Sequence, residues 1–261
     1  ADGPVSDGPP IIWLHPFCLP NGHAPAYAER PFAIHEIVRA GHVVFAFDQI
    51  GFGGRVDEGI HFYRRFPEWS KLSKMVHDAR AAIDFLFAGE DRFAFPGPPR
   101  IRASLPSQNP DRRPILLGYA LGSWVGLLTA ALDPRVAGLA CFGGLTPLRS
   151  EPKEGRWVDP VEFLGHRWGL LPSLGFYADR REAIPVELDE LFDRLKPRPC
   201  LLVAPRHDLD ANPSEMADLA APLQTDRKGN PQGLTFENPD DYNRFGPAQA
   251  RRFLDWLAIC G

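Results

Sequence analysis

Short apolar segments that alternate with helix-like segments constrain the fold of this 261-residue chain more than any other feature. The apolar segments run almost without polar interruption, and segments of this kind form strands buried on both faces of a parallel sheet. Strands are predicted by this criterion at residues 11–14, 42–47, 115–119, 136–142, 200–204 and 233–237.

The segments between these strands have the length and apolar spacing of helices. In the last of them, Phe253, Trp256 and Leu257 share one face at the spacing of an amphipathic helix. Strands that alternate with helices favour a doubly wound α/β fold with a mostly parallel sheet. Because no repeat or linker divides the chain, one domain over residues 1–261 is expected. Helices are predicted at residues 29–40, 68–88, 121–132, 187–195, 213–222 and 247–259.

Residues 143–183 interrupt this alternation. The segment is long, carries several glycines and tryptophans, and shows no strand of its own. Loops of this length in compact domains often have a functional role. We expect the segment to form an excursion over the carboxyl edge of the sheet.

The overall charge and hydrophobicity of the chain exclude several classes of partner. A net charge of −4 and a pI near 6.1 give no electrostatic basis for binding nucleic acid or an anionic membrane surface. No apolar run reaches the length of about 20 residues that a membrane span requires. We expect a soluble protein, and the sequence leaves open whether it is cytoplasmic or is secreted after removal of a leader.

The sequence predicts neither a metal site nor a cofactor. Four cysteines are scattered along the chain without metal-ligand spacing, and a disulfide between Cys200 and Cys260 stays open. The glycines of FDQIGFGG, residues 47–54, resemble a dinucleotide-binding loop, but Val56 stands where its last glycine is required.

The segment GYALG, residues 118–122, has the outline of a nucleophile elbow, G-x-S-x-G, with Ala120 in place of the serine. An apolar strand precedes it and a helix rich in small residues follows, which is the context that this motif requires. A glycine-containing junction between a strand and a helix gives the same pattern without any chemistry. The motif therefore needs support from the rest of the chain.

Three further segments supply this support, because they stand in the order that a site built around an elbow requires. IIWLHPFC, residues 11–18, is a strand that runs into a loop where an oxyanion-binding N–H is expected. FDQIGFGG follows the next strand and resembles a D-x-x-G-x-G turn, in which Asp48 would have a structural role. CLLVAPRHDLDAN, residues 200–212, is a strand followed by an acid-bearing loop.

With these segments and with LTPLRS, GLLPSLGFY and PDDYNRF, the chain is similar to the α/β-hydrolase superfamily, in its dienelactone-hydrolase and acetyl-xylan-esterase-like branch. The resemblance covers nearly the whole chain. It implies a core of eight strands, of which the first two are absent or unrecognised here. It also implies a serine-type carboxylesterase acting on a small-molecule ester or a carbohydrate ester, without a cofactor.

Matching the family motif residue by residue assigns the site. Ala120 occupies the nucleophile position, and the backbone N–H groups of Phe17 and Leu121 would bind the oxyanion, since Pro16 has no N–H. The acid matches Asp208, with Asp210 as the alternative.

The family histidine should follow the last strand, within NPDDYNRFG, residues 238–246, and no histidine is present there. A serine nucleophile needs a base that removes its proton. The candidate from elsewhere is His166, in the 143–183 excursion. The candidates for substrate binding are His15, Tyr119, Trp168 and His207.

Two hypotheses on function remain open at this stage. In the first, the chain is a serine carboxylesterase whose nucleophile has been replaced by alanine, so that it is inactive as written. In the second, it is a natural pseudoenzyme that uses the hydrolase fold to bind a ligand or partner. Related folds also host lyases and C–C hydrolases, and fold alone does not choose among these chemistries.

Overall fold

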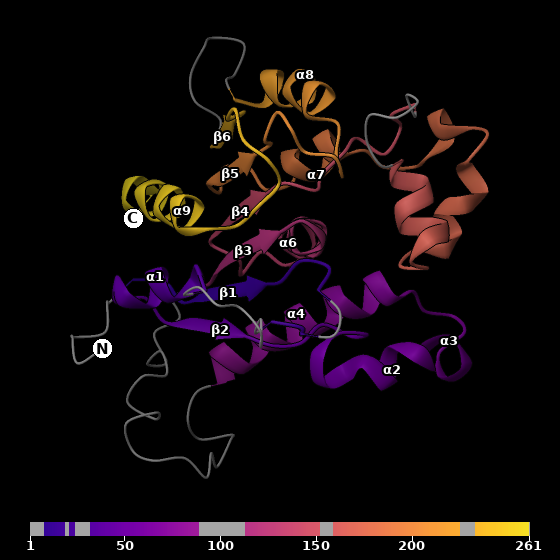
Figure 1. Cartoon of the computed structure of the whole chain (residues 1–261), viewed down its shortest axis with the longest axis horizontal. Coiled ribbons are helices and arrows are strands. Elements are labelled where there is room, and N and C mark those ends of the chain that lie inside the picture. Colours follow the sequence, from indigo (N-terminus) through magenta and orange to yellow (C-terminus); the bar gives the residue numbers. More distant parts are fainter. Residues whose placement is uncertain are drawn as a thin grey trace.

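The computed structural model describes residues 8–18, 21–23, 32–88, 113–151, 159–224 and 233–260. Within them, six parallel strands form a single sheet in the order β2-β1-β3-β4-β5-β6 (Figure 1). The predicted doubly wound α/β architecture is confirmed. The strands are β1 Ile11–Leu14, β2 Val44–Ala46, β3 Ile115–Tyr119, β4 Gly138–Phe142, β5 Cys200–Val203 and β6 Leu234–Glu237.

Helices cover both faces of this sheet (Figure 1). Helices α4, α6, α7 and α8 pack on one face, and α1 and α9 pack against each other on the opposite face. The helix bounds are α1 Ile34–Arg39, α2 Val56–Ile60, α3 Phe62–Arg65, α4 Lys71–Ala88, α6 Leu121–Leu132, α7 Leu188–Asp193, α8 Pro213–Gln224 and α9 Pro247–Cys260.

The two apolar layers explain why the strands lack polar alternation. Successive side chains of a strand point to opposite faces. Ile12 and Leu14 accordingly belong to the core under α4 and α6, whereas Ile11 and Trp13 belong to the core under α1 and α9. All four are buried, because both faces of the sheet are covered.

The register of the strands brings their carboxyl ends to one edge. Leu14 pairs with Gly118, Tyr119 with Phe142, and Val203 with Glu237. The loops that follow β1, β3, β4, β5 and β6 therefore leave the sheet side by side. This edge is where ligands bind in open parallel sheets.

In its described part, the 143–183 excursion contains one short π-helix and two short 3₁₀ helices. They are η3 Glu162–Arg167, η4 Pro172–Tyr177 and η5 Arg181–Ala183, which stand at the right of Figure 1. Trp168 packs on Phe17, which follows β1, with ring centroids 4.0 Å apart. The excursion therefore contacts the carboxyl edge of the sheet, as predicted.

Two buried charged residues fix the end of the excursion. The Arg181 guanidinium pairs with both carboxylate oxygens of Asp159, at 2.7 and 2.5 Å. The carboxylate of Glu187 accepts hydrogen bonds from the backbone N–H groups of Leu148 and Arg149, at 2.7 and 2.8 Å. These contacts join both ends of the excursion to each other and to the start of α7.

The structure confirms the six predicted strands and the six predicted helices to within a few residues, apart from the start of the first helix. Residues 29–31, with which that helix was predicted to begin, lie outside the described part. The short helices α2 and α3 were not predicted. The two strands that the resemblance would place ahead of β1 are not among the described residues.

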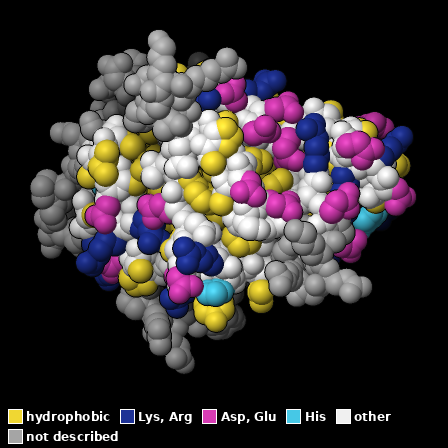
Figure 2. All heavy atoms as spheres, turned by 90° about the horizontal axis from the view of Figure 1, so that it is seen from above, with side chains coloured by type: hydrophobic (Ala, Val, Ile, Leu, Met, Phe, Trp, Pro, Cys, Tyr) yellow, Lys and Arg dark blue, Asp and Glu magenta, His cyan; other side chains and the backbone are white. Residues whose placement is uncertain are grey.

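The surface has no segregated charge on the face shown in Figure 2, where acidic and basic side chains are interspersed. Within the described residues, no helix combines the length and the apolar character that crossing a bilayer would need.

Candidate functional site

Ala120 has the backbone conformation of a nucleophile elbow. Its φ and ψ are 50° and −109°, and it is the only non-glycine residue with positive φ in the described part of the chain. Such a conformation costs an L-residue roughly 1–3 kcal/mol unless its surroundings impose it. Here the Ala120 N–H donates to the carbonyl of Phe142 at 3.0 Å, and its carbonyl accepts from the Ser123 N–H at 2.9 Å.

Close backbone approaches explain the glycines of GYALG. A Cβ on Gly118 would lie 2.3 Å from the carbonyl oxygen of Gly122, and one on Gly122 would lie 1.9 Å from that of Leu14. Gly144, in the loop after β4, approaches the turn from the other side, because its Cβ would lie 2.6 Å from the Ala120 Cα. The turn is therefore packed so tightly that side chains at these positions would not fit.

One of the two predicted oxyanion donors, Leu121, lies in the first turn of α6. Leu121 is the first residue of that helix, where backbone N–H groups point outward and the helix dipole favours negative charge. The loop carrying Phe17 reaches the same turn, since a Cβ on Gly122 would lie 3.1 Å from the carbonyl oxygen of His15. Within the described residues, neither the Phe17 nor the Leu121 N–H has a hydrogen-bond partner.

Asp208 is the acid that faces the elbow. Its side chain is buried, whereas Asp210 is exposed. One carboxylate oxygen of Asp208 accepts from the Gly144 N–H at 2.9 Å, and the other accepts from the Asp210 N–H at 2.8 Å. Burial raises the pKa of Asp208, and the two backbone hydrogen bonds oppose this shift. The geometry favours Asp208 over Asp210.

Asn243 lies where the family histidine is expected. It belongs to NPDDYNRFG, and its side-chain amide donates a hydrogen bond to the Asp208 carboxylate. A Cβ on Gly143 would lie 2.3 Å from its Oδ1. Because Gly144, the next residue, touches Ala120, the three positions Ala120, Asp208 and Asn243 converge at one point of the sheet edge.

Asn243 was not recognised from the sequence, although the segment that contains it was. A primary amide neither takes up nor releases a proton near neutral pH, so pattern searches for a base pass over it. The signal that could have found it is its position, because the segment after the last strand must contact the acid loop.

His15 is a structural residue in this fold. Its Nδ1–H donates to the carbonyl of Pro16 at 2.7 Å, and its Nε2 accepts from the Gln49 N–H at 3.0 Å. Burial lowers the pKa of His15 to about 4, so the ring is neutral at pH 7 and both nitrogens are occupied. These contacts do not leave His15 free to bind substrate, contrary to the prediction from the sequence.

The structure does not bring His166 or His207 to the elbow. The exposed ring of His166 packs against η4, where a Cβ on Gly175 would lie 2.7 Å from its Cε1. The Nε2 of His207 lies 2.8 Å from the Asp240 carboxylate, and its ring packs on Tyr242. Neither imidazole contacts Ala120 or Asp208 in the described part of the chain.

Other nucleophiles near the elbow are occupied or inert. The Ser123 hydroxyl is buried and donates to the carbonyl of Gly118 at 3.2 Å. Burial raises the pKa of the Cys141 thiol well above its usual value, which disfavours the reactive thiolate. Cys18, Cys200 and Cys260 are free thiols as well. The described residues contain no cluster of side chains that could hold a metal ion.

Solved structures with the same architecture identify the fold. TT1662 from Thermus thermophilus is 16% identical over 98% of this chain and 90% of its own, with a TM-score of 0.54. A CE15 glucuronoyl esterase from Teredinibacter turnerae is 15% identical over 99% and 67%, with a TM-score of 0.64. A promiscuous CE15 esterase from a marine bacterial metagenome is 12% identical over 97% and 74%, with a TM-score of 0.67. The chain has the α/β-hydrolase fold.

No protein-family model matches the chain, and no curated protein matches its sequence. The resemblance predicted from the sequence is therefore confirmed by the fold, at identities too low to transfer an activity. Several of the structural neighbours are esterases, so the chain is esterase-like in its architecture.

Aromatic side chains connect the loops at the carboxyl edge of the sheet. The Tyr119 hydroxyl donates to the backbone carbonyl of Asn243 at 3.1 Å, and burial raises the pKa of Tyr119 to about 12. Phe17 contacts Phe52 and Trp168, and Trp168 is partly exposed. Tyr119 therefore holds the Asn243 loop against β3, whereas Trp168 joins the excursion to the loop that carries Phe17.

Proposed function

We propose that this chain is an esterase-type α/β-hydrolase that does not hydrolyse esters as written and that retains the elbow as a binding site for a small ester or carbohydrate ester. The observation that carries the proposal is the hydrogen bond between Asn243 and Asp208 at the histidine position. Because the nucleophile position is also alanine, two of the three groups needed for acyl transfer are missing together.

The retained parts of the site favour binding over catalysis. The N–H groups of Phe17 and Leu121 are without partners among the described residues, and Leu121 stands at the N-terminus of α6. Such donors hold a carbonyl or carboxylate oxygen whether or not a nucleophile is present. A bound ester would therefore meet donors for its carbonyl oxygen but no group that attacks its carbon.

The substrate class follows from the neighbours and from the residues near the site. Glucuronoyl esterases are among the structural neighbours, which supports a carbohydrate ester. The exposed Trp168 side chain could stack on the flat face of a sugar ring or an aryl ester. We therefore propose methyl glucuronate as the first probe and methyl benzoate as the second.

The alternative is a serine carboxylesterase that has lost only its nucleophile. The strained turn at Ala120 favours this candidate, because a residue with positive φ at an elbow serves catalysis in the fold. It requires a base other than Asn243, and the candidate from the sequence, His166, packs against η4 and does not contact the elbow in this structure. The single variant Ala120→Ser distinguishes the binding protein from the serine carboxylesterase, because ester hydrolysis by this variant would support the esterase.

Calorimetry of the unmodified chain with both methyl esters tests the proposal, with chromatography of the mixture to detect hydrolysis. We expect saturable binding without product. Ala120→Met should lower the affinity at least about tenfold, because the longer side chain would occupy the place proposed for the ester. Ala258→Met, on the exposed face of α9, is the matched control and should change nothing. Product formation, or equal effects of the two variants, would contradict the proposal.

A further inference from the structure

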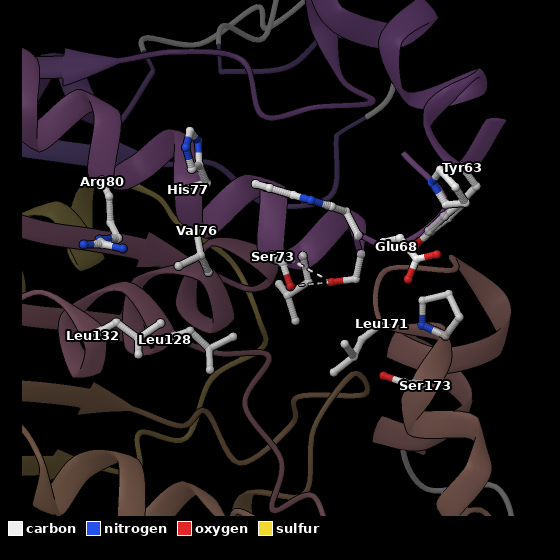
Figure 3. Close-up of a pocket in the computed structure, with 15 residues that line it drawn as sticks. Tyr63, Glu68, Ser73, Val76, His77, Arg80, Leu128, Leu132, Leu171 and Ser173 are labelled. Carbon is white, nitrogen blue, oxygen red and sulfur yellow. Dashed lines mark hydrogen bonds between the residues drawn. The ribbon is translucent and has the colours of Figure 1, made fainter. Parts of the chain in front are cut away.

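A cavity of about 820 Å³ lies on the flank of the molecule, separate from the elbow. Its walls come from α4, from the outer face of α6, from the segment between α3 and α4, and from the start of η4 (Figure 3). None of the elbow, acid-loop or Asn243 residues lines it. Its volume is within the range of about 300–1,000 Å³ that is typical of small-molecule sites.

The middle of the cavity is apolar. Val76 of α4 and Leu128 and Leu132 of α6 face the cavity together with Leu171 (Figure 3). Leu132 is 59% exposed and Trp69 is 45% exposed, although both are large apolar side chains. Apolar side chains left in water around a concave surface mark a ligand or partner site.

Charged groups of opposite sign stand at the two ends of this apolar stretch. Arg80 lies at one end, beside Leu132, and Glu68 lies at the other, beside Leu171 and Ser173 (Figure 3). A ligand in the cavity would therefore have one end near a guanidinium and the other near a carboxylate.

Arg80 retains donors for an anionic ligand. Its Nε makes a long contact of 3.4 Å to Asp133, whereas Arg135 binds the same carboxylate at 2.9 and 2.7 Å. Within the described residues, the two terminal nitrogens of Arg80 have no partner. Two parallel N–H groups of a guanidinium match the two oxygens of a carboxylate.

We propose that this cavity binds an amphipathic monocarboxylate, with the carboxylate on Arg80 and an alkyl or aryl-alkyl body along Val76, Leu128 and Leu132. Glu68 sets the orientation, because it repels a carboxylate placed at its own end of the cavity. The proposal does not depend on the elbow, since no residue is shared between the two sites.

Calorimetric titration with three probes of equal chain length tests the charge preference. Decanoate carries the anion, decanol has no charge, and decyltrimethylammonium carries a cation. We expect one decanoate per chain, bound about fivefold more tightly than decanol, with the cation weakest; the modest factor reflects the exposure of Arg80. Quenching of tryptophan fluorescence that is lost in Trp69→Phe would place the probe in the cavity.

Matched variants separate the two parts of the site. Arg80→Gln should make decanoate and decanol bind equally. Leu132→Glu should weaken both at least about tenfold, because it places a charge in the apolar stretch. Ile259→Glu, at an exposed apolar residue of α9, is the control and should have no effect. Ala120→Ser/Asn243→His should also leave decanoate binding unchanged.

Three outcomes would overturn the proposal. Decanoate binding no tighter than decanol would remove the role of Arg80, and tighter binding of decyltrimethylammonium would assign a cationic ligand instead. Equal losses in Leu132→Glu and Ile259→Glu would show that the probes adsorb to the surface rather than occupy the cavity.

Discussion

The side-chain amide of Asn243 donates a hydrogen bond to the carboxylate of Asp208, beside the strained turn at Ala120. In a working serine hydrolase this place is held by the imidazole that the acid orients. Under the proposed function, Ala120 and Asn243 occupy two positions of a triad, and neither side chain can transfer a proton.

The free energy of unfolding of Asp208→Asn, compared with that of the wild type, should increase as the pH rises. Burial raises the pKa of Asp208 above its unfolded value, so the folded state holds the proton more tightly. The wild-type free energy of unfolding therefore falls as the pH rises from about 3.8 through the raised pKa. Urea unfolding at pH 4 and pH 7 checks this: the difference between Asp208→Asn and wild type should move in favour of the variant at pH 7. A pH-independent difference would contradict it.

His15 should make the fold sensitive to acid. Burial lowers its folded pKa to about 4 from 6.5, so the unfolded state gains a proton first as the pH falls. The stability contributed by the neutral ring is complete above pH 6.5, is lost between pH 6.5 and pH 4, and amounts to about 3 kcal/mol. Denaturant unfolding across this window should show the loss, and His15→Gln should show a smaller one. An equal slope in both proteins would remove His15 as the cause.

Ala120→Gly should stabilise the chain. Glycine adopts the observed φ of 50° without the strain that alanine carries there, for a gain of about 1 kcal/mol. Ala82→Gly, in the middle of α4, is the matched control and should lower stability by about 1 kcal/mol. Thermal unfolding measures both. If the two variants shift the midpoint in the same direction, the turn at Ala120 is not strained.

Gly122→Ala should be strongly destabilising, by about 3 kcal/mol or more, because its Cβ would lie 1.9 Å from the carbonyl oxygen of Leu14. Gly126→Ala, one turn further along α6, would meet the terminal methyl of Leu139 at 3.0 Å, and a side chain can shift where a backbone cannot. The cost of this control should stay near 1 kcal/mol. Chemical denaturation of both variants provides the comparison.

Much of the fold could be predicted from the sequence, because the strands and helices depend on the local pattern of apolar residues. Strands buried on both faces, such as Leu116 and Leu117 of β3, have no polar alternation, and this feature is visible without coordinates. The elbow could also be recognised from the sequence, because its two glycines mark close backbone contacts. Gly118 approaches the backbone of Gly122, and Gly122 approaches the backbone of Leu14 in β1.

The rest of the site depends on contacts between distant segments. Asn243 meets Asp208 only because β5 and β6 pair in register, and an amide gives no sign of its role in a sequence. The cavity beside Arg80 likewise needs α4, α6 and η4 to pack together. His166 could be placed in the excursion from the sequence, but the direction of its side chain could not.

The esterase activity of Ala120→Ser/Asn243→His tests the central claim most directly. In this double variant the serine would attack the ester, the imidazole would take its proton, and Asp208 would orient the imidazole. With 4-nitrophenyl acetate, we predict a kcat/KM at least about 100-fold above the wild type and above Ala120→Ser alone. No gain over Ala120→Ser, in a double variant that unfolds at the wild-type temperature, would show that Asn243 does not hold the position of the catalytic histidine.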